Sequence, residues 1–240
     1  MKKLFVLFYG IIIALTIPMN AYAMHISEGA ISLNWCLFYY AVSLPFVVIS
    51  FKEVREVLKN NVDVKMLLAL MAAFIFLMSA LKLPSVTGSS SHPTGTGLGA
   101  ILFGPFKIPL LSVIVLLFQA LLLAHGGLTT LGANTLSMGI VGPIVSYLIF
   151  KLLKNKNKTL AVFLGCALGD LATYVVTSIQ LALAYPDSVN GFLSSFIKFA
   201  GIFAVSQVPL AIVEGLVSVV IYDYVIKHCK GELKEINGGS

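Results

Sequence analysis

Seven apolar stretches, separated by short polar or basic segments, constrain the fold of this chain more than any other feature. A helix needs about 20 mostly apolar residues to cross the hydrocarbon core of a membrane. Six of the stretches have roughly that length, and the chain is 58% hydrophobic with only 11% charged residues. The sequence therefore predicts an all-α membrane protein, a bundle of about seven transmembrane helices. The expected spans are Leu33–Phe51, Val64–Leu83, Gly95–Phe106, Ile108–Ala124, Leu131–Lys151, Leu160–Ala184 and Phe199–Val225.

The third stretch is too short for a regular spanning helix, but the distribution of basic residues requires it to cross. Cytoplasmic loops carry an excess of Lys and Arg, and two basic clusters lie on one side only if an even number of crossings separates them. We therefore expect segment 95–106 to cross as a short or broken helix, with Met24 outside the cell membrane and Ser240 in the cytoplasm. The clusters are Lys52, Arg55, Lys59 and Lys65, and Lys151, Lys154, Lys156 and Lys158.

The first 23 residues have the pattern of a secretory signal peptide. Lys2 and Lys3 precede an apolar run, and Ala21 and Ala23 supply the small residues of a signal-peptidase site. Cleavage after Ala23 would leave Met24 as the mature N-terminus. The expected organisation is a cleaved signal peptide, 1–23, followed by a single transmembrane metal-binding domain, 24–240.

A mature N-terminus at Met24 would place a free α-amine next to the imidazole of His25. The amine, the His25 backbone nitrogen and a His25 ring nitrogen can close fused rings around one ion. Nitrogen ligands suit Co, Ni, Cu and Zn. The alternative is that Met24 is a second start codon and that His25 is incidental.

His92 lies in a segment rich in Gly, Ser and Thr that leaves the second span on the same side as Met24. Irregular backbone at membrane depth occurs only where it is buried in protein or lines a cavity. His92 is therefore a candidate fourth ligand, with a loop histidine bonded to a neighbouring hydroxyl as the alternative. The glycines of this segment do not match a phosphate-binding loop.

Other polar residues in apolar surroundings are weaker candidates. His125 is a ligand, a gate residue or a hydrogen-bonded turn residue, and the structural role is favoured; Asn134 is placed to orient a ligating histidine. Asp170 and Glu214 lie within expected spans, where carboxylates are functional candidates by default. The alternative is that Gln180, Gln207 and nearby hydroxyls satisfy them. We expect His228 to be solvated, and no disulfide or zinc site from Cys36, Cys166 and Cys229.

Five segments together resemble the CbiM family across essentially the whole mature chain. They are MHISEG at 24–29, SHPTGTGLGAILFGP at 91–105, FQALLLAHGGLTTLGAN at 118–134, GDLATY at 169–174 and FAGIFA at 199–204. The resemblance implies the substrate-binding membrane subunit (S component) of a cobalt energy-coupling-factor (ECF) transporter, which supplies Co²⁺ for cobalamin synthesis. It also implies that the metal is held by the Met24 amine, the His25 backbone nitrogen and imidazole, and His92. Around these ligands we expect Ser91, Thr94, His125 and Asn134 as neighbouring residues.

The metal and the energy source are less constrained by the residues themselves. The Ser-His-Pro-Thr-Gly form around His92 resembles the cobalt branch, but a four-nitrogen site suits Ni²⁺ at least as well, so a nickel-specific subunit is the alternative. The sequence has neither a nucleotide-binding motif nor an HExxH motif, so we expect a transporter subunit rather than an enzyme. The expected partners are a membrane coupling (T) subunit, cytoplasmic ATPases, a small accessory membrane subunit and membrane lipid, and no nucleic acid. A stand-alone secondary transporter remains the rival.

Overall fold

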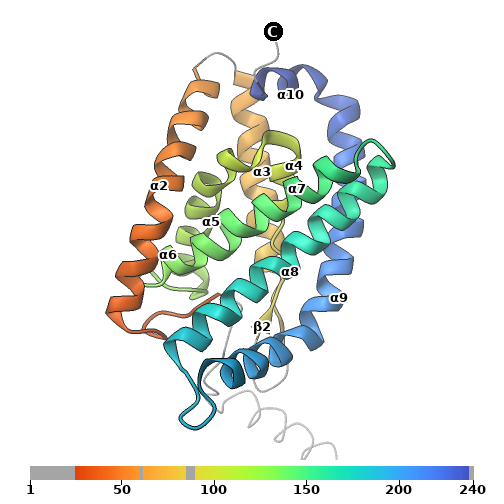
Figure 1. Ribbon diagram of the computed structural model, residues 1–240. Coiled ribbons are helices and arrows are strands. Elements are labelled where there is room, and N and C mark those ends of the chain that lie inside the picture. Colours follow the sequence, from red (N-terminus) through yellow and green to blue (C-terminus); the bar gives the residue numbers. More distant parts are fainter. Residues whose placement is uncertain (1–24, 60–61, 85–89, 238–240) are drawn as a thin grey trace, which may run out of the picture.

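The computed structural model describes residues 25–59, 62–84 and 90–237, which form a bundle of long helices (Figure 1). The predicted signal peptide and Met24 lie outside the described residues. The elements are α2 (Leu33–Val57), α3 (Val62–Ala80), β1 (Leu83–Pro84), β2 (Ser90–Ser91), α4 (Thr96–Phe103), η2 (Pro105–Lys107), α5 (Ile108–Leu123), α6 (Leu131–Asn134), η3 (Thr135–Val141), α7 (Gly142–Leu153), α8 (Lys158–Ala184), α9 (Gly191–His228) and α10 (Lys230–Ile236).

Six helical segments of the described chain are long and apolar enough to cross a membrane. Their outer faces carry exposed large apolar side chains, including Leu33, Leu152 and Val220, as expected where lipid replaces water. The prediction of a multi-pass, all-α membrane protein is confirmed, apart from the short antiparallel pairing of β1 with β2. The segments are α2, α3, Pro105–Leu123, Leu131–Leu153, α8 and α9.

The third expected span, 95–106, is not a spanning helix, so the count of seven helices is not confirmed. Within it α4 has only eight residues, or about 12 Å of helix against a hydrocarbon thickness of about 30 Å. All eight residues are buried. Residues 92–95 and α4 together carry the chain from the β2 end of the bundle to the α10 end (Figure 1). The crossing is made by irregular backbone and a short helix enclosed by protein, the setting that such backbone requires in a membrane.

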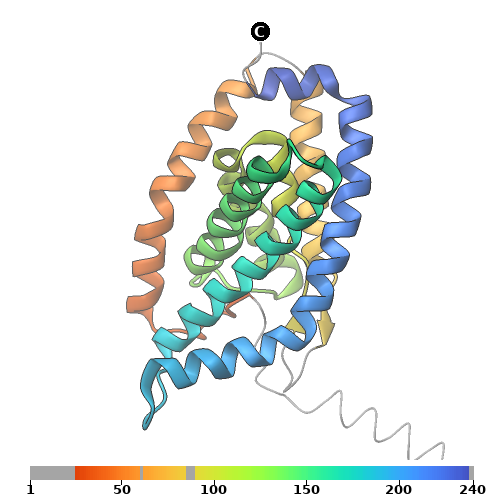
Figure 2. The same cartoon turned by 45° about the vertical axis from the view of Figure 1, so that its right-hand side comes forward.

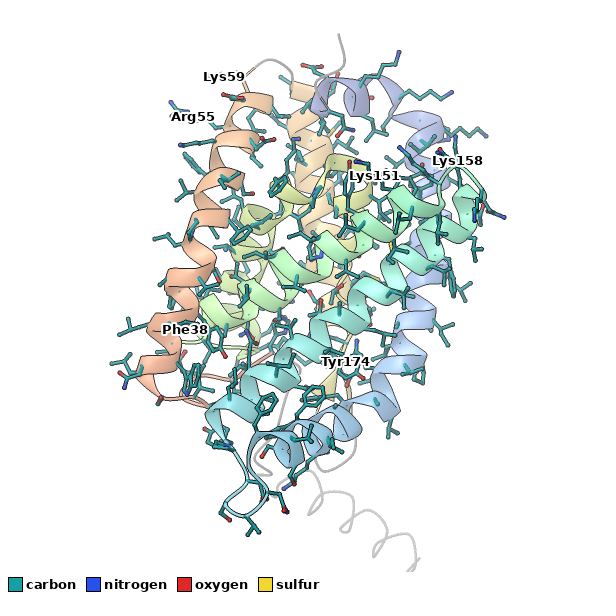
Figure 3. The ribbon with its side chains drawn as sticks, in the orientation of Figure 1. Phe38, Arg55, Lys59, Lys151, Lys158 and Tyr174 are labelled. Carbon is teal, nitrogen blue, oxygen red and sulfur yellow. The ribbon has the colours of Figure 1, made fainter. Side chains whose placement is uncertain are left out.

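Labelled residues of the two basic clusters lie at one end of the bundle. Figure 3 labels Arg55, Lys59, Lys151 and Lys158, and all four lie at the end that carries α10. Both basic clusters therefore share an end, as the charge pattern predicted. The opposite end holds β2 and the turn that precedes α6 (Figure 1).

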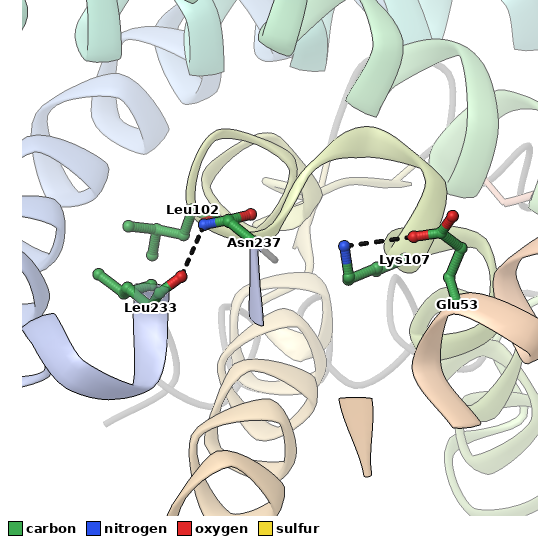
Figure 4. A network of polar contacts seen from close by, with 5 residues as sticks. All are labelled: Glu53, Leu102, Lys107, Leu233 and Asn237. Carbon is green, nitrogen blue, oxygen red and sulfur yellow. Dashed lines mark hydrogen bonds and ion pairs between the residues drawn. The ribbon is translucent and has the colours of Figure 1, made fainter. Parts of the chain in front are cut away.

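Polar contacts fasten the buried short helix to its neighbours at the basic end (Figure 4). The side-chain amide of Asn237 donates to the carbonyl of Leu102 at 2.9 Å, which ties the C-terminal segment to α4. Lys107 forms an ion pair with Glu53 of α2 at 3.3 Å. The carbonyl groups at the end of a helix lack partners within it, so the Asn237 contact satisfies one of them.

Helix α9 runs from one end of the bundle to the other and is longer than a membrane is thick. Its 38 residues span about 57 Å if straight. Figure 2 shows that its first part lies across the end near β2 before the helix turns along the bundle. Pro209 inside the helix removes one backbone hydrogen bond, a common cause of a bend.

Gly169 of α8 allows the closest approach of this helix to α7, and we expect Gly169→Ala to destabilise the protein. A Cβ atom at Gly169 would overlap the hydroxyl of Ser146, which is buried and bonded to the Gly142 carbonyl. Overpacking of this kind costs about 1–3 kcal/mol. Thermal unfolding in detergent should show a lower midpoint for this variant. Gly201→Ala on α9 is the matched control, because nothing lies within 4 Å of its Cβ position; equal midpoints for the two variants would contradict this packing.

Candidate metal centre

Three buried histidines from distant parts of the chain meet at the end of the bundle opposite the two basic clusters. His25 comes from the first described segment, His92 from the irregular backbone before α4, and His125 from the turn after α5. His25 Nδ1 lies 2.8 Å from His92 Nε2 and 2.6 Å from His125 Nε2. Three such ring nitrogens within 4.8 Å of one another form a group able to hold a metal ion.

The hydrogen-bond partner of His92 assigns its proton. His92 Nδ1 lies 2.9 Å from the Pro93 carbonyl oxygen, which only accepts, so Nδ1 carries the proton and Nε2 is bare. His25 Nε2 lies 3.2 Å from the thioether sulfur of Met138, a weak acceptor, while its Nδ1 faces the Nε2 atoms of His92 and His125. The bare Nε2 of His92 thus points at His25 Nδ1, and both nitrogens belong to the group that is able to hold a metal ion.

Polar side chains of the segment 130–134 hold His25 in place through its neighbour. The amide of Asn134 accepts a hydrogen bond from Ile26 N at 2.8 Å and donates to Ile26 O at 3.0 Å. The hydroxyl of Thr130 donates to the same carbonyl at 2.6 Å. These bonds fix the backbone on the C-terminal side of His25, so its ring position does not depend on side-chain packing alone.

The turn that carries His125 requires unusual backbone angles. Ala124 has a φ of 47° and Gly126 a φ of 76°, both in the left-handed region. A side chain at Gly126 would also meet the Asn134 amide, at 3.1 Å. The backbone N–H of His125 donates to the Gln119 carbonyl at 3.1 Å and closes the end of α5. Gly126 therefore allows the tight turn that places the His125 ring against His25.

Burial keeps the three imidazoles in the neutral form that binds metals. Desolvation lowers the pKa of His92 to about 4 and that of His125 to about 2. Desolvation, followed by repulsion from His125 and His92, holds the pKa of His25 well below its usual range. A histidine ligand must be unprotonated, so all three rings are ready to bind at neutral pH.

The residues expected around the ligands take different positions. Ser91 bonds to Ser206 of α9 at 2.7 Å, and Thr94 bonds to Glu214. Asn134 contacts the backbone of Ile26 rather than a histidine ring, whereas His125 lies directly at the ring cluster. Met24, expected as a ligand, lies outside the described residues.

Of the two glutamines expected as partners of the carboxylates in the spans, one contacts a carboxylate. The amide of Gln207 donates to Asp170 at 2.6 Å, while Gln180 donates instead to the Ala133 carbonyl. Gln207 also reaches the His92 carbonyl, at 3.1 Å. Met138 and this role of Gln207 were not anticipated, because an uncharged residue in an apolar span gives no sequence signal for a site. His228 is exposed and the three cysteines are free, as expected.

Comparisons with known proteins show the family to which the chain belongs. Residues 25–230 match the family model of CbiM, the cobalt uptake substrate-specific transmembrane region. The chain is 56% identical to a protein of Clostridium tetani named cobalt transport protein CbiM, over 99% of both chains. It is also 56% identical to a protein of the same name from Thermosipho melanesiensis, over 95% of this chain and 97% of that one.

Two solved structures share the fold. A truncated transition metal transporter superposes with a TM-score of 0.73 and 26% identity, covering 85% of this chain and 99% of its own. A second transition metal transporter has a TM-score of 0.74 at 24% identity and covers 88% of this chain and 96% of its own. The named relatives are transport proteins rather than enzymes. The chain belongs to the CbiM family of transmembrane proteins for cobalt uptake.

Proposed function

We propose that this chain captures Co²⁺ at its outer face and delivers it across the membrane as the substrate-binding subunit of an ATP-driven importer. The observation that carries the proposal is the convergence of three buried imidazoles, with His25 Nδ1 lying 2.8 Å from His92 Nε2 and 2.6 Å from His125 Nε2. Imidazole nitrogens grouped in this way are suitable ligands for a divalent transition-metal cation. Co²⁺ is the cation named by the family and by the relatives.

The donor set that we propose is the Met24 amine, the backbone nitrogen and Nδ1 of His25, and His92 Nε2. Nδ1 is the ring nitrogen that closes a six-membered chelate ring with the residue's own backbone nitrogen. It is also the His25 nitrogen that faces His92 and His125. His125 Nε2 is available as a fifth donor, which would move the ion away from the planar four-nitrogen geometry favoured by Cu²⁺ and Ni²⁺.

The orientation that we propose follows from the charges at the two ends. Basic loops remain in the cytoplasm, and the labelled basic residues share the α10 end (Figure 3). The C-terminal segment would then be cytoplasmic, and the histidine cluster would face the outside with the mature N-terminus. Capture on this side suits an importer in the cell membrane.

Energy must come from other subunits, because the sequence contains no GxxxxGK[ST] nucleotide-binding motif. We expect a membrane coupling subunit, cytoplasmic ATPases and a small accessory membrane subunit to act with this chain. ATP hydrolysis would drive the conformational change that opens the buried site, since a ligand alone shifts an equilibrium only by its differential affinity.

Vesicle uptake tests this function. The purified chain in liposomes should bind about one Co²⁺ without accumulating it, and the coupling subunit with ATPases should convert binding into ATP-dependent uptake. Concentrative uptake by the chain alone, driven by a proton or sodium gradient, would instead identify a secondary transporter. Asp170 and Glu214 would then be the leading coupling residues.

The pH dependence of binding tests the proposed N-terminal donors. Between about pH 8 and about pH 5 the imidazoles stay neutral, because burial lowers the pKa of His92 to about 4 and holds those of His25 and His125 below their usual range. The α-amine, with an ordinary pKa of about 8, and the His25 backbone nitrogen must both lose protons to bind. Affinity should therefore weaken as the pH is lowered from about 8 to about 5. Calorimetry in several buffers should show about one to two protons released for each Co²⁺ bound. A constant affinity would indicate imidazole ligands alone.

A further inference from the structure

The backbone on either side of His92 is held by two side chains of α9. Glu214 accepts hydrogen bonds from Thr94 N at 2.5 Å, Thr94 Oγ1 at 3.0 Å and Gly95 N at 2.9 Å. Gln207, two turns earlier in the helix, donates to the carbonyl of His92 at 3.1 Å. Both side chains are fully buried. The histidine segment therefore depends on α9 for partners that secondary structure would otherwise provide.

Glu214 supplies a hydrogen-bond acceptor at the start of α4. The first N–H groups of a helix have no partner within it, and Gly95 at the N-cap of α4 has no side chain to supply one. A carboxylate suits this position because the N-terminus of a helix carries a partial positive charge. Glu214 accepts from the N–H groups of Thr94 and Gly95, immediately before α4, and so holds the backbone from which the helix begins.

The same segment is packed tightly on its other side. A Cβ atom at Gly95 would lie 3.2 Å from both Ile75 and Met78 of α3. Gly95 also has a φ of 71°, a conformation that glycine adopts without strain. The segment 92–95 is thus clamped between α3 and the Glu214 carboxylate, and the His92 ring is tied to it through Pro93.

Asp170 of α8 completes the network by orienting Gln207. Its Oδ2 accepts from Gln207 Nε2 at 2.6 Å, and the same amide nitrogen reaches the His92 carbonyl. The contact with Asp170 Oδ2 thus orients the amide nitrogen of Gln207 toward the His92 carbonyl. None of these side chains is bonded directly to a histidine ring among the described contacts.

We infer that Glu214 is a positioning residue for the metal: it sets Co²⁺ affinity by fixing the backbone of His92, with Gln207 and Asp170 in support. The inference rests on the proposed function, since it assumes that His92 is a ligand. Glu214 acts only through His92, so its removal has no effect on a site that already lacks that ring. This property separates positioning from a general contribution to folding.

A double-mutant cycle tests the inference with the full chain in detergent, using Co²⁺ affinity and the visible absorption spectrum of bound Co²⁺. Glu214→Gln keeps the shape of the side chain but turns one acceptor into a donor that faces Thr94 and Gly95. We expect Co²⁺ to bind about 10- to 100-fold more weakly, as when an outer partner of a ligand is removed, with a changed spectrum. In a His92→Ala background the same change should alter affinity less than about twofold.

Two further variants keep the experiment decisive. Ser218→Ala, one turn beyond Glu214 and also buried, is the matched control and should bind like the unmodified chain. Thr94→Val removes the hydroxyl bond to Glu214 and a longer bond from the Thr96 hydroxyl but leaves the carboxylate in place, so it serves if Glu214→Gln does not fold. It should weaken binding several-fold, and only while His92 is present.

The outcomes separate this inference from the proposed ligand set. An equal loss of affinity with and without His92 would overturn positioning and indicate a structural role for Glu214. Unchanged affinity in Glu214→Gln and Thr94→Val, with His92→Ala impaired, would also overturn it while sparing the ligand set. Unchanged affinity in His92→Ala would overturn both.

Discussion

His25→Ala and His92→Ala should each reduce Co²⁺ binding by more than the about 10- to 100-fold that loss of an outer partner costs. Each change removes one of the two ring nitrogens that lie 2.8 Å apart in the histidine cluster. His25→Ala should be the more severe, because it removes a chelate ring as well as a ligand. Equilibrium titration of the purified, metal-free chain in detergent measures the effect.

His228→Ala is the control for this series, since His228 is exposed at the C-terminal end of α9 and is not part of the histidine cluster. His125→Ala should have an intermediate effect and should narrow the preference for Co²⁺ over Ni²⁺ if the ring supplies a fifth donor. Full affinity in His92→Ala together with loss of binding in His125→Ala would move the ligand from one ring to the other.

The second large effect concerns the N-terminus. Replacing Ala23 with Leu should block cleavage, because signal peptidase requires a small residue at this position. The chain would then keep residues 1–23, and the nitrogen of Met24 would be a peptide nitrogen instead of an amine. We expect tight Co²⁺ binding to be lost although the histidines are unchanged.

Tyr22→Phe is the matched control for this experiment, because the central position of the Ala-x-Ala pattern is unrestricted. Mass spectrometry of the intact chains establishes whether each was cleaved. Tight binding by a chain that still carries residues 1–23 would exclude the α-amine from the donor set.

Much of the fold could be predicted because membrane spans are encoded locally. Continuous apolar runs predicted α2, α3, α5, α8 and α9, and the lysines predicted that segment 95–106 passes between the two ends. The form of that passage could not be predicted. Helix α4 lies between Gly95 and Gly104. Glu214 accepts from the Gly95 N–H and Asn237 donates to the Leu102 carbonyl, and no local sequence pattern indicates these contacts.

The site was predictable only where sequence context marked a residue. His25 was marked by the predicted cleavage site and His92 by a polar segment in apolar surroundings. For His125 the sequence favoured a structural role over a ligand role, since nothing in the sequence indicates its contact with His25, 100 residues away. Glu214 was recognised as a buried charge, but its partners belong to irregular backbone whose path depends on the assembled bundle.

X-ray absorption spectroscopy at the cobalt edge tests the central claim most directly, because it reports the atoms around the ion. The Co²⁺-loaded, cleaved chain should show a first shell of nitrogen and the outer-shell scattering of at least about two imidazoles, one of which is lost in His92→Ala. Met138 should contribute no sulfur to the first shell, because its thioether faces His25 Nε2, whereas the proposed ligand is the other ring nitrogen, Nδ1. A first shell of oxygen ligands, with imidazole scattering absent or unchanged in His92→Ala, would contradict the proposed capture site.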